Sequence, residues 1–372
     1  MNNSITIQNQ PNPFILTRFL YVKDEVEIAL LLSILQKRKE DSLFWAYELY
    51  YSGFQEEVFQ LIWTIYIDFF ATLNPLFETY LSTMIKEWTK EWKEEWNKDI
   101  TLGILVENLL IRPFNTDVFM LSRLYLKENE NIEIIEIKTM VEWTTSNNYQ
   151  QIANYIFTEP IEKTEPIIRS ALKQIDPKYK FKKLQLFSNS DFNKKQLLSR
   201  VLMCLTSEKP KKKQFYMMID EAKIEPFKCD KVCSVRPYRI LTQRCVKGTN
   251  DSGYLSLFAF ALSRYKLEED VYSVYHNDWL YYASFSPIWL HRIHKHNGIR
   301  DEEKRCVVFS NEEDEEEFYN CWNYEPDEQS RELKQKTIPE INQYDNSNSN
   351  SNSVCSWEIF QQNYNQNGIV KL

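Results

Sequence analysis

The chain has 372 residues, of which 43% are hydrophobic and 26% are charged, and its net charge is -8. These values are typical of a globular protein with one large helical domain or two ordinary ones. Six glycines are very few for this length. Phosphate-binding loops and tight hairpins use glycine because it adopts positive φ, so the composition argues against nucleotide-binding folds and against all-β folds.

The cysteines and the N-terminus bear on the compartment. Seven cysteines without a disulfide-like spacing suit a reducing environment. The first residues are polar and lack the apolar core of a signal peptide. The uncharged apolar runs Val58–Ile67 and Phe69–Phe77 are about half as long as a membrane span requires. We therefore expect a soluble intracellular protein with no membrane span.

The first elements along the chain are helical. Residues 1–20 are expected to form an irregular N-terminal arm. Asp24 then caps a helix, with Glu27 three residues later as in a capping box. A second helix starts near Asp41 and ends at Gly53, which is expected to adopt the left-handed cap conformation.

The third and fourth helices carry the large aromatic side chains. The third, Gln55 to about Thr72, is apolar nearly all round, which predicts an interior helix with Trp63 and Phe69 buried at its centre. Asn74-Pro75 ends it. The fourth places Trp88, Trp92 and Trp96 on one face and Lys and Glu on the other. Short loops favour antiparallel neighbours, so residues 24–96 are expected to form a compact antiparallel unit.

Further helices are predicted at 101–111, 117–127, 149–157, 166–175 with Pro166 in its first turn, 192–206, 254–265 and 287–296. Ser286 and Pro287 form a good N-cap and N1 pair for the last of these. The segment Ile132–Ile137 is compatible with strand or helix. Residues 215–219 and 238–241 are candidate short strands.

The predicted fold is mainly α: an N-terminal antiparallel helical bundle or stack of helical hairpins, followed by a mixed but mostly helical C-terminal region. The predicted divisions are an arm at 1–20, a helical domain at 21–206, a second, mostly helical region with a few short strands at 207–335, a flexible Asn/Ser linker at 336–353 and a C-terminal docking segment at 354–372.

Two groups of residues are candidate metal ligands. Cys229, Cys233 and Cys245 offer three thiolates, but structural zinc usually requires two close pairs. His291 and His294 share a helix face, although histidines near a helix C-terminus also favour the dipole. In both cases the ordinary interpretation outweighs a metal, so we expect no metal, no cofactor and no catalytic residue.

A basic region is the main pointer to nucleic acid. Residues 173–213 hold twelve Lys or Arg against three acidic residues, whereas residues 301–317 hold nine acidic residues against two basic ones. Lysine runs are most often only solvated, but they can contact phosphates. The candidate phosphate contacts are Lys194, Lys195, Lys209, Lys211, Lys212 and Lys213.

Four aromatic residues are candidate partner contacts. Trp96 lies at the end of the tryptophan face, although such a face is ordinarily core. Trp357, Phe360 and Tyr364 have the i, i+3, i+7 spacing of a helix that binds in a groove. The alternative for 354–372 is a disordered end, because Asn and Gln dominate the positions between these aromatics.

Several segments of the sequence resemble those of an uncharacterised protein family of giant nucleocytoplasmic large DNA viruses. These segments are Ser42–Phe54, Phe69–Tyr80, Trp279–Trp289 and Asn323–Gln329. They occur in both halves of the chain, so the resemblance would span its full length. It implies a viral origin and a cytoplasmic life cycle, and it transfers no catalytic or binding residue.

The leading functional interpretation is a non-enzymatic viral structural or scaffold protein, a virion component or assembly factor that contacts other viral proteins. It would be found in the virion or in the viral factory of the host cytoplasm. The alternative is a nucleic-acid-binding accessory factor in viral replication or transcription. A highly diverged enzyme is a third reading, because catalytic carboxylates leave no motif in a chain this rich in Asp and Glu.

Overall fold

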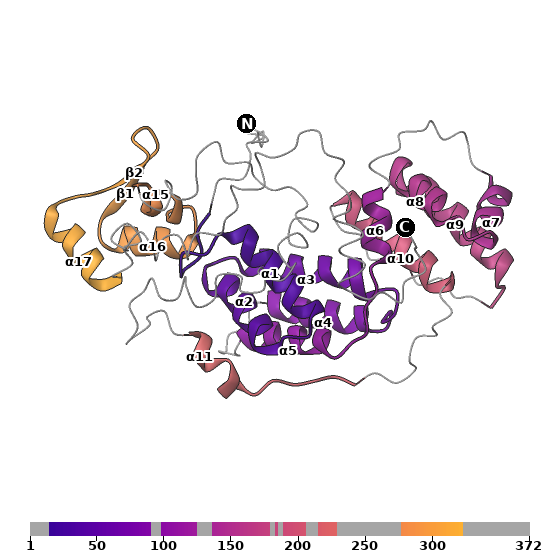
Figure 1. Cartoon of the computed structure of the whole chain (residues 1–372), viewed down its shortest axis with the longest axis horizontal. Coiled ribbons are helices and arrows are strands. Elements are labelled where there is room, and N and C mark those ends of the chain that lie inside the picture. Colours follow the sequence, from indigo (N-terminus) through magenta and orange to yellow (C-terminus); the bar gives the residue numbers. More distant parts are fainter. Residues whose placement is uncertain are drawn as a thin grey trace. The chain divides into compact units, whose positions relative to one another are not determined.

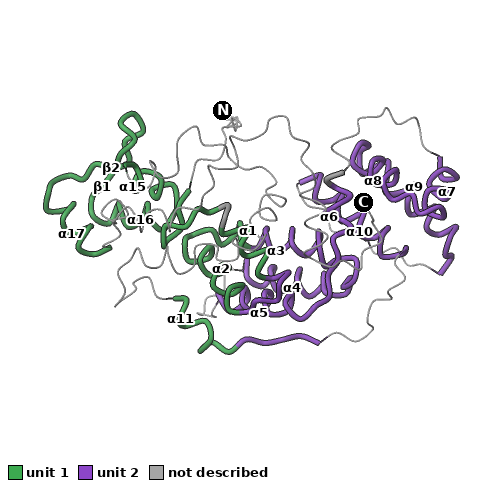
Figure 2. Tube along the Cα trace, in the orientation of Figure 1, with its two compact units in different colours: residues 1–33, 40–58, 220–356 green, residues 34–39, 59–219, 357–372 purple. Residues whose placement is uncertain are grey.

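The computed structural model describes residues 15–90, 98–124, 136–178, 183–184, 189–205, 215–228 and 277–322. Within these ranges the chain is mainly α, with 14 α-helices and one two-stranded sheet (Figure 1). The prediction that the chain is mainly α is therefore confirmed. Figure 2 shows two compact units: unit 1 comprises 1–33, 40–58 and 220–356, and unit 2 comprises 34–39, 59–219 and 357–372.

The units interleave along the sequence, whereas the sequence predicted contiguous regions at 21–206 and 207–335. The predicted internal boundaries near 206 and 335 fall beside or outside the described residues, so they stay predictions. Residues 16–20, assigned to the N-terminal arm, are buried. The packed structure therefore already includes residues 16–20, which the sequence had placed in an irregular arm.

Unit 2 is built from helices. They are the greater part of α3 (Gln55–Ile65), a π-helix (Tyr66–Phe70), α4 (Phe77–Thr89), α5 (Lys98–Leu110), α6 (Asp117–Leu124), α7 (Ile137–Thr145), α8 (Tyr149–Thr158), α9 (Ile161–Ile175) and α10 (Ser190–Leu205). The core prediction is confirmed, since Trp63 is 6% exposed and Phe69 2% exposed. The Phe69 ring stacks on that of Phe119 at 5.0 Å between centroids.

The predicted third helix does not continue as an α-helix to Thr72. At Tyr66 it changes to a π-helix, in which the Ala71 N–H donates to the Tyr66 carbonyl at 2.8 Å. Asp68, inside this turn, is buried and pairs with Lys195 of α10 at 2.8 Å. A π turn shifts the following side chains around the axis, which is how a continuous apolar run accommodates one buried carboxylate.

Two other helix predictions for unit 2 need correction. α9 begins at Ile161, so Pro166 lies inside the helix and not in its first turn. The buried stripe of Thr164, Ile168, Ala171 and Leu172 follows the helical period. Its burial outweighs the one backbone hydrogen bond that proline removes. α7 was not predicted, because the preceding Ile-Glu alternation also suited a strand.

Unit 1 combines helices with a hairpin. Its elements are most of α1 (Lys23–Leu35) and α2 (Lys39–Tyr51), a 3-10 turn (Glu221–Lys223), α11 (Glu225–Lys228), α15 (Trp279–Ala283), α16 (Pro287–Lys295), β1 (Gly298–Asp301), β2 (Cys306–Phe309) and α17 (Glu312–Trp322). α1 starts one residue before Asp24, so the predicted cap lies in the first turn.

Local cap signals in unit 1 are otherwise confirmed. Gly53 has φ +96°, the left-handed conformation expected after α2. The Ser286 hydroxyl accepts from the Trp289 N–H at 3.4 Å, which caps α16 as predicted.

The antiparallel hairpin β1–β2, with Ile299 opposite Val308, was not predicted. The turn between its strands is stabilised by the Asp301 side chain, whose oxygen accepts from the N–H groups of Glu303 and Lys304.

Candidate functional site

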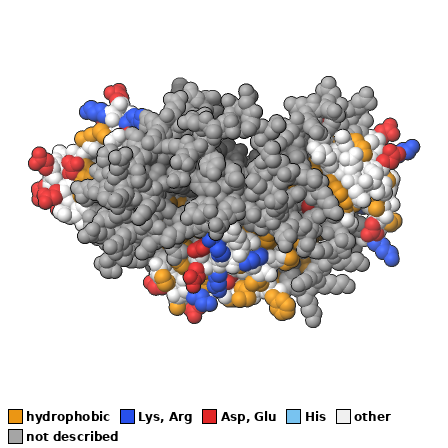
Figure 3. Space-filling view, in the orientation of Figure 1, with side chains coloured by type: hydrophobic (Ala, Val, Ile, Leu, Met, Phe, Trp, Pro, Cys, Tyr) orange, Lys and Arg blue, Asp and Glu red, His pale blue; other side chains and the backbone are white. Residues whose placement is uncertain are grey.

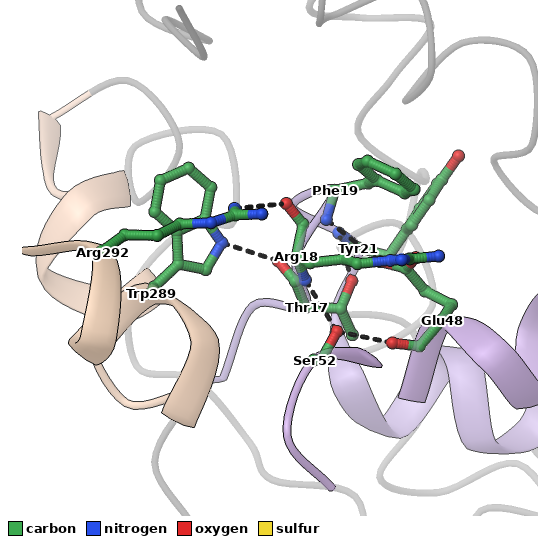
Figure 4. A network of polar contacts seen from close by, with 8 residues as sticks. All are labelled: Thr17, Arg18, Phe19, Tyr21, Glu48, Ser52, Trp289 and Arg292. Carbon is green, nitrogen blue, oxygen red and sulfur yellow. Dashed lines mark hydrogen bonds and ion pairs between the residues drawn. The ribbon is translucent and has the colours of Figure 1, made fainter. Parts of the chain in front are cut away.

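A buried polar network joins three parts of unit 1, as Figure 4 shows. Arg18 donates from Nε to Glu48 of α2 at 2.9 Å, and its N–H donates to the Ser52 hydroxyl at 2.8 Å. The Phe19 N–H donates to the other Glu48 oxygen at 3.0 Å. The side chains of Arg18 and Glu48 are 1% and 0% exposed. Charges this deeply buried are stable only when paired and hydrogen-bonded, as these are.

α16 joins the same network through its own polar side chains (Figure 4). The Trp289 indole donates to the Thr17 carbonyl at 3.0 Å, and Arg292 donates to the Arg18 carbonyl at 3.3 Å. The Arg292 guanidinium also lies 4.0 Å from the centroid of Trp322. The network is closed to solvent, so its role is to fix residues 17–21 between α2 and α16.

A second polar arrangement, in unit 2, reaches the surface. Asn108 of α5 forms two hydrogen bonds with the backbone of Met217: its amide nitrogen donates to the carbonyl at 2.8 Å, and its oxygen accepts from the N–H at 3.0 Å. Arg112, which lies two residues beyond the C-terminus of α5, donates to the Phe215 carbonyl at 3.1 Å. We call Asn108 and Arg112 the main-chain clamp, and residues 215–218 the clamped segment.

The clamp itself is held rigidly. Arg112 donates to the Asn108 side-chain oxygen at 3.0 Å, and its guanidinium lies 3.9 Å from the centre of the Phe77 ring of α4. Tyr216 of the clamped segment packs on Tyr80 at 4.2 Å between centroids. Burial lowers the pKa of Arg112 to about 10, with the nearby Tyr216 and Tyr80 opposing that shift. Arg112 is therefore charged at neutral pH, which strengthens its hydrogen bond to the carbonyl.

Below the clamp lies a buried ion pair. Glu78, next to Phe77 in α4, pairs with Arg200 of α10 and accepts from the Gln196 amide at 2.8 Å. Glu78 is 3% exposed and Arg200 is 1% exposed. Burial, followed by the charge of Glu78, raises the pKa of the adjacent Tyr66 phenol above its usual range. This pair links α4, which carries Phe77, to α10.

The clamped segment leaves its apolar side chains largely in solvent. Phe215 is 80% exposed and Met218 70% exposed. Leu76 and Ile111, the sequence neighbours of Phe77 and Arg112, are 53% and 48% exposed. Figure 3 shows hydrophobic side chains along the lower edge of the view, where Figure 1 places α4, α5 and the chain before α11. We call Leu76, Ile111, Phe215 and Met218 the apolar surface.

Two of the lysines predicted to contact nucleic acid are engaged within unit 2. Lys194 donates to the Phe157 carbonyl at 2.6 Å, and Lys195 pairs with the buried Asp68. Both ammonium groups thus have intramolecular partners. The candidates Lys209, Lys211, Lys212 and Lys213 lie outside the described residues, as do the partner-binding candidates Trp96, Trp357, Phe360 and Tyr364.

The metal candidates divide in the same way. Cys229, Cys233 and Cys245 lie outside the described residues. His291 and His294 are exposed on α16, with His294 in its last turn, as the dipole interpretation expects. Over the described ranges no group of three or more His, Cys, Asp or Glu is placed to hold a metal.

The clamp was not predicted from the sequence. One signal was present: Asn108 is a polar residue among the apolar side chains of the last turns of α5, and Arg112 follows just beyond the end of that helix. A polar residue in such a helix needs a partner, but the partner's identity depends on tertiary packing.

Comparison with family models, with curated proteins and with solved structures gave no match. Among the described residues, no helix has the length and apolarity needed to cross a membrane.

Proposed function

We propose that this chain is a non-enzymatic viral protein that acts through protein–protein contacts, as a virion component or an assembly scaffold. The observation that supports this is the apolar surface beside the main-chain clamp. Single exposed hydrophobic residues are ordinary, but Phe215 to Met218 form a run of four large apolar side chains, each at least 40% exposed. Contiguous exposed apolar residues are typical of sites that bind another protein.

The rigidity of the site supports the same proposal. Binding is weakened when a surface must be ordered at the moment of contact. Here the backbone of Phe215 and Met217 is already fixed by three hydrogen bonds from the clamp. The viral part of the proposal depends on the resemblance of the sequence segments quoted above.

Site-specific photo-crosslinking tests the contact. A benzoylphenylalanine at position 111, 215 or 218 is expected to capture one partner of defined mass in cells that produce the chain. The matched control is position 175 in α9, where Ile175 is also exposed, at 39%. An equal yield from position 175, or no adduct from the three surface positions, would contradict the proposed surface.

Virion proteomics tests the second half of the proposal. Abundance in purified particles is expected of a virion component. Confinement to the replication factory would instead favour the accessory role.

A further inference from the structure

The clamp recognises a peptide backbone. The Asn108 side chain forms hydrogen bonds with both the N–H and the C=O of Met217, and Arg112 donates a third bond to the carbonyl of Phe215, two residues before Met217. Contacts of this kind hold an extended peptide independently of most of its side chains. One side chain, Tyr216, adds a specific contact by stacking on Tyr80.

We infer that the α4–α5 surface is a binding site for an extended peptide of the form apolar–aromatic–apolar, and that the clamped segment is its built-in occupant. The ligand class is read from the segment seen in the site: a backbone held at two alternate residues, with an aromatic side chain between them. This inference rests on the proposed function and names the kind of partner segment that it would bind.

The built-in occupant uses little of the available surface. Phe215 and Met218 gain little burial from the site, and Leu76 and Ile111 beside it stay about half exposed. A partner peptide with the same backbone bonds that also covers Leu76 and Ile111 would bury more apolar area and so bind more tightly. Displacement of the occupant by such a peptide is therefore expected.

The probe for the test is a fluorescent synthetic peptide with the sequence of residues 213–220, measured by fluorescence polarisation. The unaltered full chain should bind it weakly, because its own segment competes. The full chain with residues 215–218 replaced by Gly-Ser-Gly-Ser should bind it at least about tenfold more tightly. Adding Asn108→Ala to that variant removes two hydrogen bonds and should weaken binding by about tenfold or more.

The matched control is Asn154→Ala in the same background. Asn154 is 5% exposed on α8 of the same unit and should leave peptide affinity unchanged. If the occupant-free variant folds with parental helicity and does not bind the peptide, the inference is wrong. It is also wrong if Asn108→Ala leaves the affinity unchanged.

A measurement on the unaltered chain covers the case in which the occupant-free variant fails to fold. Excess peptide should speed deuterium uptake by the fragment containing Met217, whose N–H is bonded to Asn108, while a scrambled peptide should not. Unchanged uptake overturns the inference. Photo-crosslinking at position 215 can still succeed in that case, so failure here is distinguishable from failure of the proposed function.

Discussion

At the scale of single residues, large buried aromatic side chains contact one another across the core of unit 2. Trp63 is the clearest example. Its ring lies edge-on to Tyr66 at 5.9 Å and to Phe192 of α10 at 6.4 Å between centroids. It thus connects the π-helical turn with a helix more than 120 residues later in the chain.

Trp63→Ala is expected to lower the free energy of unfolding by about 3–5 kcal/mol, because it leaves a large cavity in a packed core. Urea unfolding followed by circular dichroism measures the loss. Trp143→Ala on α7 is the control, since Trp143 is only partly buried and should cost clearly less. Equal losses from the two substitutions would contradict the central position of Trp63.

Tyr66 predicts a specific pH dependence. Burial, then the charge of Glu78, raises the pKa of the folded phenol above its ordinary value of 10.0. Above pH 10 the unfolded chain releases this proton while the folded chain keeps it. The stability that the group contributes is therefore complete below pH 10 and is lost as the pH rises further.

Tyr66→Phe tests this dependence. The substitution removes the hydrogen bond to the Asn74 carbonyl and should cost about 1 kcal/mol at pH 7. At pH 11 the parent should lose its advantage over Tyr66→Phe, as measured by urea unfolding at both pH values. An unchanged difference between the two proteins would show that the Tyr66 pKa is not raised.

Gly53 has a strict backbone requirement. A Cβ at this position would lie 2.5 Å from the Pro287 Cβ, and the φ of +96° disfavours any L side chain. Gly53→Ala should therefore lower the melting temperature by several degrees, corresponding to about 1–3 kcal/mol. Gly103→Ala, inside α5, is the comparison, because replacing a helical glycine with alanine normally stabilises the helix.

At the scale of elements, buried ion pairs decide which helices pack together. Glu78–Arg200 joins α4 to α10, and Asp68–Lys195 joins the π-helix to the same α10. The Glu78–Arg200 pair is almost fully shielded from solvent, so the burial of each charge is tolerated only because the other charge is present.

Arg200→Met should cost about 3–5 kcal/mol, because it leaves Glu78 buried without its counter-charge. The double variant Glu78→Met/Arg200→Met should lose much less than the sum of the two single changes, giving a coupling above about 1 kcal/mol in a double-mutant cycle. The same cycle on the exposed pair Lys163–Glu159 should give below about 1 kcal/mol. Comparable couplings for the two pairs would refute the assignment.

At the scale of the whole molecule, the two units share the chain in alternating segments. Unit 1 takes residues from the start of the chain and from 220 onward, so neither unit is a continuous piece of sequence. Truncation at a boundary predicted from sequence alone, such as 206, would therefore divide unit 1.

The C-terminal segment 354–372, which lies outside the described residues, carries a prediction made from its sequence. Three aromatic side chains at groove-binding spacing should be covered by a surface. Deleting 354–372 should therefore lower the melting temperature or remove a co-purifying partner. If neither thermal stability nor the set of partners changes, the segment has no docking role.

Features that depend only on neighbouring residues could be predicted from the sequence. The helical class follows from the apolar periodicity, the Gly53 cap from the conformational freedom of glycine, the Ser286 cap from its hydroxyl, and the burial of Trp63 from a helix that is apolar nearly all round. Each of these signals acts within a few residues, so it can be read without knowing what lies opposite.

The pairing of the buried polar groups could not be predicted, because it depends on contacts between distant parts of the chain. The Asn108 amide finds the backbone of Met217, 109 residues away, and Arg200 finds Glu78, 122 residues away. A π turn in place of an α turn sets the direction in which Asp68 points, and so its pairing with Lys195. Sequence composition shows that such groups need partners, but the partner is fixed by packing, because a buried polar atom bonds to whatever polar atom the fold brings within about 3 Å.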